Sequence, residues 1–335
     1  MIDLPSALPR KPIVVLLGPT AVGKSALAVQ LARVLGTEVL AADSRQVYRG
    51  MDIATDKPSM QERNGIPHGL IDVVNPDEPF NAGLYRRAAD REIARLHGEG
   101  KLPLIVGGTG LYIRALVGGL CEGPGADPAI RAALREEVEH LGAEALHRRL
   151  AGLDPVAAAR LHPNDRVKVM RALEVHAQTG RPLSALQAQH GFATRSYAAL
   201  LIGLQRERDD LYARIEGRIE MMLARGVVEE AKQLLAWGYD RQLGSMKGLG
   251  YKQLVGYLAG EYDYEEAVRR LKRDTRHFAK RQLTWFRKEP GITWLSLAPT
   301  VEAPVLLATV MDRIGRFLAD LGSGGRRAAV PQEGT

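Results

Sequence analysis

The chain has 335 residues, of which 45% are hydrophobic and 25% are charged, as is ordinary for a soluble globular protein of two domains or one domain with a large insertion. Its single cysteine, Cys121, excludes an internal disulfide framework and a cysteine-ligated metal cluster. No apolar run is long enough for a secretory signal or a membrane span, so we expect a cytoplasmic protein. The formal net charge of +7 favours a polyanionic partner, either nucleic acid or a phosphorylated substrate.

The first third of the chain predicts strands that alternate with helices. Residues 12–18 (PIVVLLG) are a β-branched run ending in a glycine loop, and residues 25–36 (SALAVQLARVLG) have the period of an amphipathic helix. Two further buried strands are predicted in residues 37–44 (TEVLAADS) and 101–110 (KLPLIVGGTG). This alternation indicates an α/β fold with a P-loop NTPase-like parallel sheet, which binds phosphate at the carboxyl ends of its strands.

The pattern changes near residues 121–128 (CEGPGADP). From there to about residue 196 the chain has helical periodicity, a strand returns at Tyr197, and further helices run to about Lys288. The glycine-rich end of the chain, GSGGRRAAVPQEGT, predicts disorder. We therefore expect an α/β core with C-terminal helices in residues 12–120 and 197–320, a mainly helical insertion domain in 121–196, and a disordered tail in 321–335.

A phosphate-binding loop follows the first predicted strand. The segment GPTAVGKS fits the pattern G-x-x-x-x-G-K-[ST], with a strand before it and a helix after it. Loop N–H groups and the helix N-terminus would hold anionic oxygens, Lys24 would contact the phosphates, and the Ser25 hydroxyl would ligate Mg²⁺. The alternative is a glycine turn that merely precedes a helix. The residues assigned to this site are Gly18, Pro19, Thr20, Ala21, Val22, Gly23, Lys24 and Ser25.

A nucleotide-hydrolysing enzyme would carry a second acid at the end of an apolar strand. Residues 104–108 (LIVGG) end without one, and Asp72 lies in a short strand followed by a turn. Asp43, at the end of the second strand, is the acid best placed to face the loop and to join Ser25 as a metal ligand. A helix N-cap is another common use of Asp after a strand, and position alone leaves both interpretations open.

Seven segments of residues 12–290 together resemble the tRNA dimethylallyltransferase family, also called the tRNA isopentenyltransferases. The resemblance implies that the loop holds the diphosphate of dimethylallyl diphosphate with Mg²⁺. It also implies transfer of the dimethylallyl group to N6 of the adenosine just 3′ of the anticodon, adenosine 37, in tRNAs reading codons that begin with U. The diphosphate is then the leaving group. The segments are GPTAVGKS, DSRQVYRGMDIATDKP, HGLIDVVNPDEPFNAGLY, LIVGGTGLYIRAL, ARLHPNDRVKVMRALEV, KGLGYKQL and KRQLTWFRK.

The resemblance assigns catalytic roles to four side chains. Asp43 is implied as the general base that accepts the proton of adenine N6, and Lys24 and Arg218 as cations that bind the diphosphate. Thr109, in the GGTG segment, is implied to contact tRNA beside the channel that receives the flipped base. Without the resemblance, Arg218 is better interpreted as an exposed helix residue near Glu220, and Thr109 as a helix N-cap.

A basic segment, residues 268–288, carries interleaved aromatic side chains that would stack on unpaired bases. By itself it is better interpreted as an amphipathic helix whose Leu271, Phe278 and Leu283 belong to the core. The resemblance favours RNA contacts here and in the insertion, with the tRNA anticodon stem-loop as partner. The implied contacts are Asp43, Ser44, Arg45, Gln46, Thr109, Arg131, Val167, Lys168, Val169, Met170, Arg171, Lys247, Gly248, Leu249, Gly250, Tyr251, Lys252, Lys280, Arg281, Gln282, Trp285 and Arg287.

Three residues depart from the family's pattern. Lys168 and Lys247 stand where the family typically has arginine, which keeps the charge but loses the planar guanidinium that pairs with and stacks on bases. Arg166 stands where proline is usual. None of them lies in the loop or at Asp43, so we expect the chemistry to be intact, while the affinity for RNA is left open.

Two other enzyme classes share parts of this pattern. A small-molecule or nucleotide kinase has the same strand, loop and helix, but it requires no basic, aromatic C-terminal segment. A nucleic-acid-stimulated NTPase would need an acidic strand end and an arginine finger. Both predict nucleotide turnover, whereas a dimethylallyltransferase predicts none. An RNA clamp built from one chain further predicts a monomer without an obligate protein partner.

Overall fold

The computed structural model describes residues 11–119, 123–190, 196–298 and 300–327, so Cys121 lies outside the described residues. The chain divides into two compact units, one of residues 1–117 and 196–335 and one of residues 118–195. We call the first the core unit and the second the helical unit. The helical unit occupies the part of the sequence expected to be an insertion, with slightly different boundaries.

A six-stranded sheet with the order β3-β2-β4-β1-β5-β6 forms the centre of the core unit. All of its strand pairs are parallel, which confirms the α/β fold that the sequence predicts. Strand β1 lies between β4 and β5, and its last residue, Leu17, pairs with Gly107 on one side and Gly203 on the other. The strands are β1 Lys11–Leu17, β2 Val39–Ala42, β3 His68–Gly69, β4 Leu104–Gly107, β5 Tyr197–Gln205 and β6 Ile292–Ser296.

The edge strand β6 was not predicted from the sequence, and the short strand expected around Asp72 is shorter than expected, because β3 ends at Gly69 and Asp72 lies in a bend with a left-handed φ of 54°. β3 has two residues, and β6 has no buried residue, so neither carries the apolar run that marks the central strands. In β1, by contrast, the six residues after Lys11 are all buried. The position of β6 is set by its pairing with Leu201–Gln205, which are remote in the chain.

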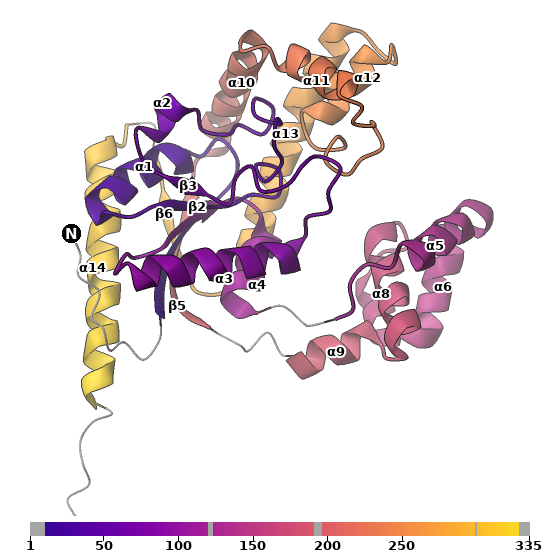
Figure 1. Ribbon diagram of the computed structural model, residues 1–335, viewed down its shortest axis with the longest axis horizontal. Coiled ribbons are helices and arrows are strands. Elements are labelled where there is room, and N and C mark those ends of the chain that lie inside the picture. Colours follow the sequence, from indigo (N-terminus) through magenta and orange to yellow (C-terminus); the bar gives the residue numbers. More distant parts are fainter. Residues whose placement is uncertain (1–10, 120–122, 191–195, 299, 328–335) are drawn as a thin grey trace, which may run out of the picture. The chain divides into compact units, whose positions relative to one another are not determined.

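Helices cover both faces of the sheet, and Figure 1 shows α1 and α3 on opposite sides of it. Val14 and Leu16 of β1 join a core cluster with side chains from α1, α10, α13 and α14. Helix α1 ends at Gly36 as predicted, because the left-handed φ of 63° there favours glycine. The helices of the core unit are α1 Lys24–Leu35, α2 Met60–Arg63, α3 Ala82–Gly98, α4 Gly110–Gly118, α10 Arg208–Ala224, α11 Val227–Ala236, α12 Tyr251–Leu258, α13 Tyr264–Phe286 and α14 Ala303–Arg327.

Helix α14 corrects part of the predicted tail. It continues through Arg327, so residues 321–327 are helical and not disordered, while residues 328–335 lie outside the described part of the chain. Val310 and Ile314 of this helix are fully buried in the core cluster. Because a packed helix adds one hydrogen bond per residue once it has formed, it can extend into a glycine-rich sequence that would not start a helix.

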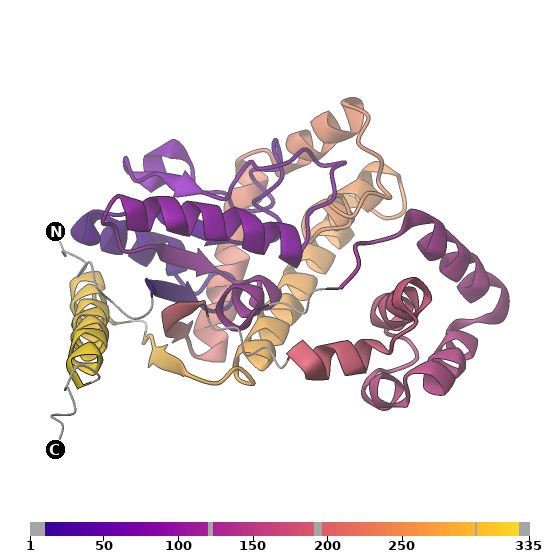
Figure 2. The same ribbon diagram turned by 60° about the horizontal axis from the view of Figure 1, so that its bottom comes forward.

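The helical unit consists of helices throughout residues 128–190, apart from short connections (Figure 2). It has a core of its own, with Leu146, Leu150 and Val169 among its most buried residues. Asp154, 1% exposed, accepts hydrogen bonds from Ala157 and Ser184 and so joins α7 to α9. The helices are α5 Pro128–Leu141, α6 Ala143–Leu153, α7 Pro155–Arg160, α8 Arg166–Thr179 and α9 Leu183–His190.

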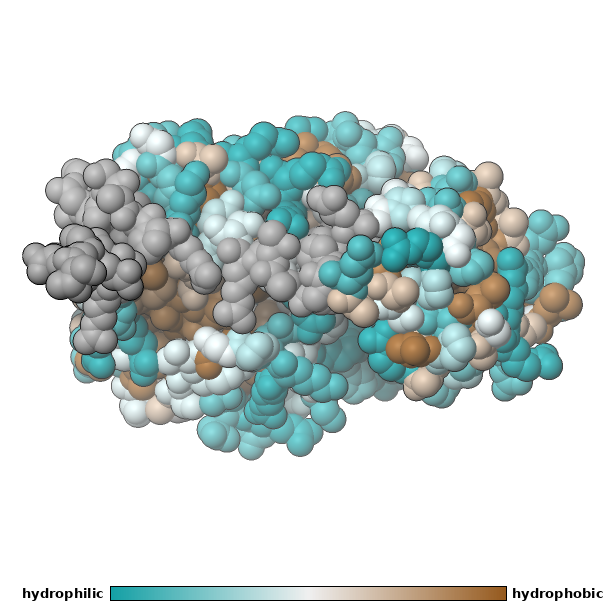
Figure 3. Space-filling view, turned by 90° about the horizontal axis from the view of Figure 1, so that it is seen from below, coloured by the Kyte–Doolittle hydropathy of each residue, from teal (hydrophilic) through white to brown (hydrophobic). Residues whose placement is uncertain are grey.

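The surface is mixed in character. Hydrophilic residues dominate the face drawn in Figure 3, with hydrophobic residues scattered among them. Across the described residues, every helix is too short or too polar to cross a membrane.

Candidate active site

A cavity of about 1090 Å³ opens in the core unit beside the carboxyl ends of β2 and β4. Parallel sheets bind ligands at this edge, because the loops that follow the strands diverge there. The phosphate loop lines one part of the cavity, and the segments after β2 and β4 line another. Helices α10 and α13 and the connection before α12 complete it.

The phosphate loop has the backbone that its glycines predict. Gly18 has a φ of 149°, and a Cβ there would lie 2.6 Å from the carbonyl oxygen of Leu204, so the close approach of the loop to β5 requires glycine. Gly23 precedes α1 with a φ of 111° and no side-chain cap. Lys24 and Ser25, the first residues of α1, line the cavity, and no side chain caps the N–H groups there, as an anion site at a helix N-terminus requires.

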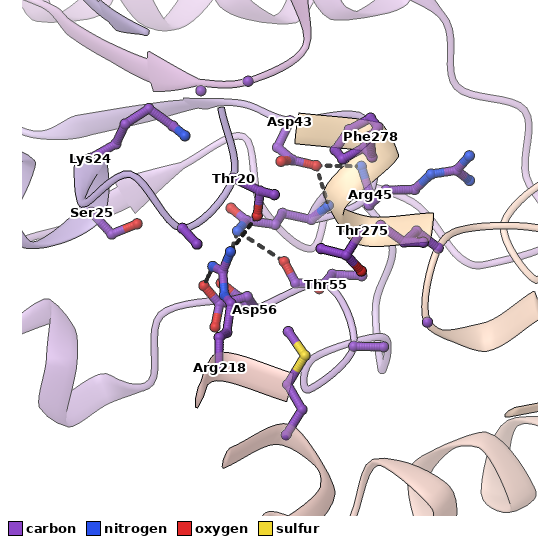
Figure 4. A pocket seen from close by; sticks show the side chains of 18 of the residues that line it. Thr20, Lys24, Ser25, Asp43, Arg45, Thr55, Asp56, Arg218, Thr275 and Phe278 are labelled. Atoms are coloured by element: carbon purple, nitrogen blue, oxygen red, sulfur yellow. Dashed lines mark hydrogen bonds and ion pairs between the residues drawn. The ribbon is translucent and has the colours of Figure 1, made fainter. Parts of the chain in front are cut away.

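Lys24 begins α1 and points into the cavity (Figure 4). Its ammonium donates to the carbonyl oxygens of Gly18 at 3.0 Å and Pro19 at 2.7 Å. Burial and, to a smaller extent, the nearby charge of Arg218 lower the pKa of Lys24 to about 7, although the charge of Asp43 opposes the shift. An anion bound in the cavity would favour the charged form of this lysine.

Arg218 reaches the phosphate loop from α10 and donates to the hydroxyl of Thr20 (Figure 4). It forms an ion pair with Asp56, and its side chain is only 20% exposed. The alternative of an exposed residue paired with Glu220 is therefore wrong. Burial lowers the pKa of Arg218 to about 10, against the opposing charge of Asp43, so the guanidinium remains charged at neutral pH.

Two more arginines support the loop and were missed in the sequence. Arg206, just after β5, donates through Nε to the carbonyl oxygen of Val22 at 2.9 Å, and Arg214 of α10 donates to that of Ala21 at 3.0 Å. Arg214 and Arg218 are four residues apart, which places both on one face of a helix, and this spacing was the only sign in the sequence that they act together. The neighbouring residues do not indicate that this face contacts the phosphate loop.

Asp43 follows β2 and lines the same cavity as Lys24 (Figure 4). Its Oδ1 accepts hydrogen bonds from the backbone N–H groups of Arg45 at 2.8 Å and Gln46 at 3.3 Å. These bonds resemble those of a helix N-cap, but residues 44–47 form turns and not an α-helix. Within the described residues no hydrogen bond uses Oδ2, so this oxygen is available to a substrate.

Thr109, in the segment after β4, is tied to the segment that carries Asp43. Its hydroxyl oxygen accepts a hydrogen bond from the backbone N–H of Ser44 at 3.0 Å, and its own N–H donates to the carbonyl of Ala42 at 3.1 Å. Among the described hydrogen bonds, this hydroxyl does not cap α4, as the alternative would require. Asp43 and Thr109 therefore present neighbouring polar groups to one part of the cavity.

The GGTG segment packs closely against α13. A Cβ at Gly108 would lie 2.3 Å from the amide nitrogen of Gln282, and one at Gly110 would lie 2.3 Å from the Trp285 ring. The guanidinium of Arg114 lies 4.6 Å from the centre of that ring. The two glycines thus make room for side chains of α13, which explains the glycine pattern around Thr109.

The predicted RNA contacts of the core unit fall into two groups. Arg45, Gln46, Lys247, Leu249, Gly250, Lys252, Arg281 and Gln282 line the cavity together with Asp43, Ser44 and Thr109. Gly248, Tyr251, Lys280, Trp285 and Arg287 do not line it. Tyr251 is 1% exposed and donates to Glu230 at 2.6 Å, so its side chain supports the fold and does not contact RNA. Lys280, on α13, and Arg287, just after its end, are exposed.

Helix α13 combines the two interpretations of residues 268–288. Leu271, Ala279 and Phe286 are buried on one face, as expected of an amphipathic helix. Phe278 and Arg281 line the cavity, and Arg281 lies 5.9 Å from the Phe278 ring. Leu271 is in the core and Leu283 packs against it, as expected, whereas Phe278, also expected in the core, lines the cavity.

The predicted contacts of the helical unit are not all available to RNA. Arg131 and Arg171 both pair with Glu174, which is fully buried, at 2.8 and 2.7 Å. Val169 is 1% exposed, so its side chain belongs to the core of this unit and cannot contact RNA. The other members, Val167, Lys168 and Met170, are on or near the surface, with Val167 80% exposed. Lys168 pairs with Asp165.

The donor set of the cavity fits a Mg²⁺ ion carried by a diphosphate. Among the described residues, no group of three or more His, Cys, Asp or Glu side chains is arranged to hold a metal by itself. Mg²⁺ typically takes only one or two protein oxygens and completes its shell with phosphate and water oxygens. The Ser25 hydroxyl and the Asp43 carboxylate are such oxygens and line the same cavity.

The parallel sheet, the glycine-containing loop after β1 and the cationic cavity at the carboxyl edge of the sheet define a protein of the P-loop NTPase-like fold class. Two family models match the chain, IPP transferase over residues 46–289 and isopentenyl transferase over residues 11–72. The tRNA dimethylallyltransferase of Geobacter sulfurreducens is 54% identical over 283 residues, covering 84% of this chain and 91% of the relative. That of Syntrophobacter fumaroxidans is 52% identical over 289 residues, covering 86% of this chain and 84% of the relative.

Solved structures of similar fold come from the same family. The full-length tRNA isopentenylpyrophosphate transferase of Bacillus halodurans matches with a TM-score of 0.72 at 39% identity, over 95% of this chain and 100% of that chain. A eukaryotic dimethylallyltransferase, captured in crystals acting on tRNA, matches with a TM-score of 0.77 at 29% identity, over 91% of this chain and 80% of that chain. The chain therefore belongs to the IPP transferase family and is an enzyme of the tRNA dimethylallyltransferase class. Membership of this family argues against the two alternative functions, a kinase and a nucleic-acid-stimulated NTPase.

Proposed function

We propose that this enzyme transfers the dimethylallyl group of dimethylallyl diphosphate to N6 of adenosine 37, just 3′ of the anticodon, in tRNAs reading codons that begin with U. The C1–O bond to the diphosphate breaks, the C1–N6 bond forms, and N6 loses one proton. The enzyme acts in the cytoplasm as a single chain. The relatives' names, which include tRNA dimethylallyltransferase, support the substrate class.

The phosphate loop supplies the leaving-group end of the cavity. Loop N–H groups, Lys24 and Arg218 would hold the diphosphate and meet the negative charge that grows on its oxygens as the C1–O bond breaks. Ser25 and Asp43 would hold Mg²⁺, and the ion would neutralise part of the diphosphate charge. Arg206 and Arg214 keep the loop in place through its carbonyl groups.

Asp43 lies at the other end of the cavity, where N6 of the adenine, the acceptor of the dimethylallyl group, would bind. An exocyclic amine is a weak nucleophile and must lose a proton as it attacks, so a carboxylate within hydrogen-bond reach assists the step. Oδ1 of Asp43 is fixed by two backbone N–H groups, which leaves Oδ2 to accept the proton from N6. Thr109 lies on the adjoining segment, where its hydroxyl is held by Ser44 and borders the same part of the cavity.

The anticodon stem-loop would meet the basic rim of the cavity. Lys247, Lys252 and Arg281 are exposed and line it, and such side chains can follow RNA phosphates. Phe278 offers a ring on which the extruded base could stack. Lys247, where the family typically has arginine, would keep a phosphate contact but not a paired contact to a base.

One observation carries the proposal: Asp43 lines the same cavity as the cations Lys24 and Arg218. The test uses radiolabelled dimethylallyl diphosphate, Mg²⁺ and tRNA from cells that lack the modification. Label should enter acid-precipitable RNA without ATP and map to adenosine 37. Label at another nucleotide, or transfer only with ATP, would contradict the proposal.

A control separates RNA specificity from general reactivity. The same tRNA with guanosine at position 37 should accept no label, because it lacks the N6 amine that the reaction needs. Chelation of divalent cations should stop incorporation, and added Mg²⁺ should restore it. Incorporation that survives chelation would remove Mg²⁺ and its ligands from the proposal while leaving the transfer reaction in place.

A further inference from the structure

Gln282 lies on the buried face of α13 and is only 8% exposed. Its side-chain oxygen accepts a hydrogen bond from the backbone N–H of Thr20 at 2.9 Å. Its side-chain nitrogen donates to the backbone carbonyl of Gly108, also at 2.9 Å. The reverse amide orientation would set N–H against N–H and oxygen against oxygen, so both contacts require the orientation observed.

The two backbone groups that Gln282 joins belong to opposite ends of the proposed reaction site. Thr20 is in the phosphate loop, and its hydroxyl accepts from Arg218, a cation assigned to the diphosphate. Gly108 immediately precedes Thr109, whose hydroxyl is bonded to the residue after Asp43. One buried amide therefore bridges the leaving-group end and the acceptor end.

The bridge also explains why Gly108 has no side chain. A Cβ there would lie 2.3 Å from the Gln282 amide nitrogen and 3.3 Å from the carbonyl oxygen of Gly18. The phosphate loop and the GGTG segment thus run close together at this point, and the amide fills the gap that remains. Both loops need this partner, because an unpaired buried N–H or C=O is costly.

We propose that Gln282 is a positioning residue for prenyl transfer, which holds the phosphate loop and the GGTG segment at the separation the reaction needs. This inference rests on the proposed function. It gives Gln282 a role different from the RNA contact that the resemblance implies for this residue. The amide acts through the two loops, because its oxygen and its nitrogen are both bonded to their backbones.

The first test compares the wild-type enzyme with Gln282→Met, which has a similar length but neither donor nor acceptor. A shift of about 1 Å between reacting groups costs about a hundredfold in rate, so single-turnover transfer should fall by about tenfold to a hundredfold. The KM for tRNA should stay within about twofold, because the exposed cations are unchanged. An RNA contact would give the opposite split, with a raised KM and a preserved rate.

Thr284→Ala is the matched control on the same helix. Thr284 is exposed, and among the described residues its hydroxyl donates a hydrogen bond to the Lys280 carbonyl of its own helix at 2.9 Å. The control should transfer at the wild-type rate. Thermal unfolding of each variant shows whether it folds, and if Gln282→Met does not, Gln282→Asn takes its place as a shorter amide that cannot reach both loops.

A double-mutant cycle tests the bridge itself. Gly108→Ala alone places a methyl group against the Gln282 amide and should lower the transfer rate as much as Gln282→Met does. Adding Gln282→Ala removes the group that the methyl meets, so the double variant should be no slower than Gln282→Ala alone. Additive losses would overturn the inference, as would a wild-type rate in Gln282→Met. Failure of the wild-type enzyme to transfer label would instead reject the proposed function.

Discussion

Arg218 of α10 forms an ion pair with Asp56, so the arginine that faces the phosphate loop has a counter-ion in the cavity before any substrate binds. A bound diphosphate would compete with this carboxylate for the guanidinium and would be repelled by it. The pair therefore holds Arg218 in place at some cost in affinity for the anion. Asp56 was not recognised in the sequence as part of the site.

Asp56→Asn should strengthen the binding of dimethylallyl diphosphate. Removing the negative charge from the cavity lining favours the anion, and we expect a Kd lower by about threefold to tenfold. Asn suits the left-handed φ of 53° at this position. Calorimetry with dimethylallyl diphosphate measures the change. Asp312→Asn, which breaks an exposed pair with Arg316 on α14, is the matched control and should leave the Kd unchanged.

Asp43→Asn should slow transfer without weakening tRNA binding. An amide oxygen can still accept from the N–H groups of Arg45 and Gln46, so the turn is kept while the base is lost. We expect single-turnover rates about 10² to 10⁴ lower and an unchanged Kd for tRNA. Rapid-quench kinetics and filter binding measure the two quantities. A parallel loss of rate and tRNA affinity would show that the carboxylate acts mainly in binding.

The affinity for dimethylallyl diphosphate should fall as the pH rises through neutrality. The pKa of Lys24 is lowered to about 7, so the lysine is charged below that pH and neutral above it. If the charged form binds the anion, the Kd should be about tenfold higher at about pH 8 than at about pH 6. Lys24→Met should bind more weakly and lose this part of the pH dependence. An identical profile in both enzymes would assign the titration to another group.

Glu174→Gln should destabilise the helical unit. The carboxylate is fully buried and holds Arg131 and Arg171, so its loss leaves two cations without their partner and should cost about 3 kcal/mol. Burial opposes the ionisation of Glu174, but hydrogen bonds from both arginines outweigh it and lower its pKa below 4.5. Its stabilising contribution is thus complete above about pH 4.5 and is lost as the pH falls through the folded-state pKa.

Thermal unfolding at several pH values checks this prediction, and the difference from the wild type should shrink on acidification. Glu137→Gln is the control within the same unit, because Glu137 pairs with the half-exposed Arg149 and should change stability by less than about 1 kcal/mol. If the two substitutions lowered the free energy of unfolding equally, the buried carboxylate of Glu174 would contribute no more to stability than the partly exposed carboxylate of Glu137.

Lys247→Ala should weaken tRNA binding and leave the chemical step unchanged. Lys247 is exposed at the cavity rim, where a phosphate contact would release one counter-ion, so the salt dependence of log Kd should lose about one unit of slope. Titrations at several salt concentrations measure this slope. Lys232→Ala, an exposed lysine of α11 paired with Glu229, should show the wild-type slope. A smaller single-turnover rate at saturating tRNA would place Lys247 in the chemistry instead.

Much of the architecture could be predicted from the sequence because it depends on neighbouring residues. The run Ile13–Leu17, the glycines of the phosphate loop and the period of α1 each act over a few positions, and the structure has the predicted strand, loop and helix. The edge strand β6 could not be predicted, because its residues become a strand only by pairing with β5. Helix α14 likewise extends beyond its expected end by packing on the core.

The sequence by itself determined the α/β fold, the phosphate loop and the position of Asp43 at a strand end, because each depends on the order of a few neighbouring residues. Only the tertiary structure decided which distant residues share the cavity: Asp56 beside Arg218, and Gln282 between Thr20 and Gly108. It also showed that the side chains of Val169 and Tyr251, which were expected to contact RNA, are buried. The physical reason is that burial and long-range pairing are fixed by how the elements pack, and no local pattern encodes that packing.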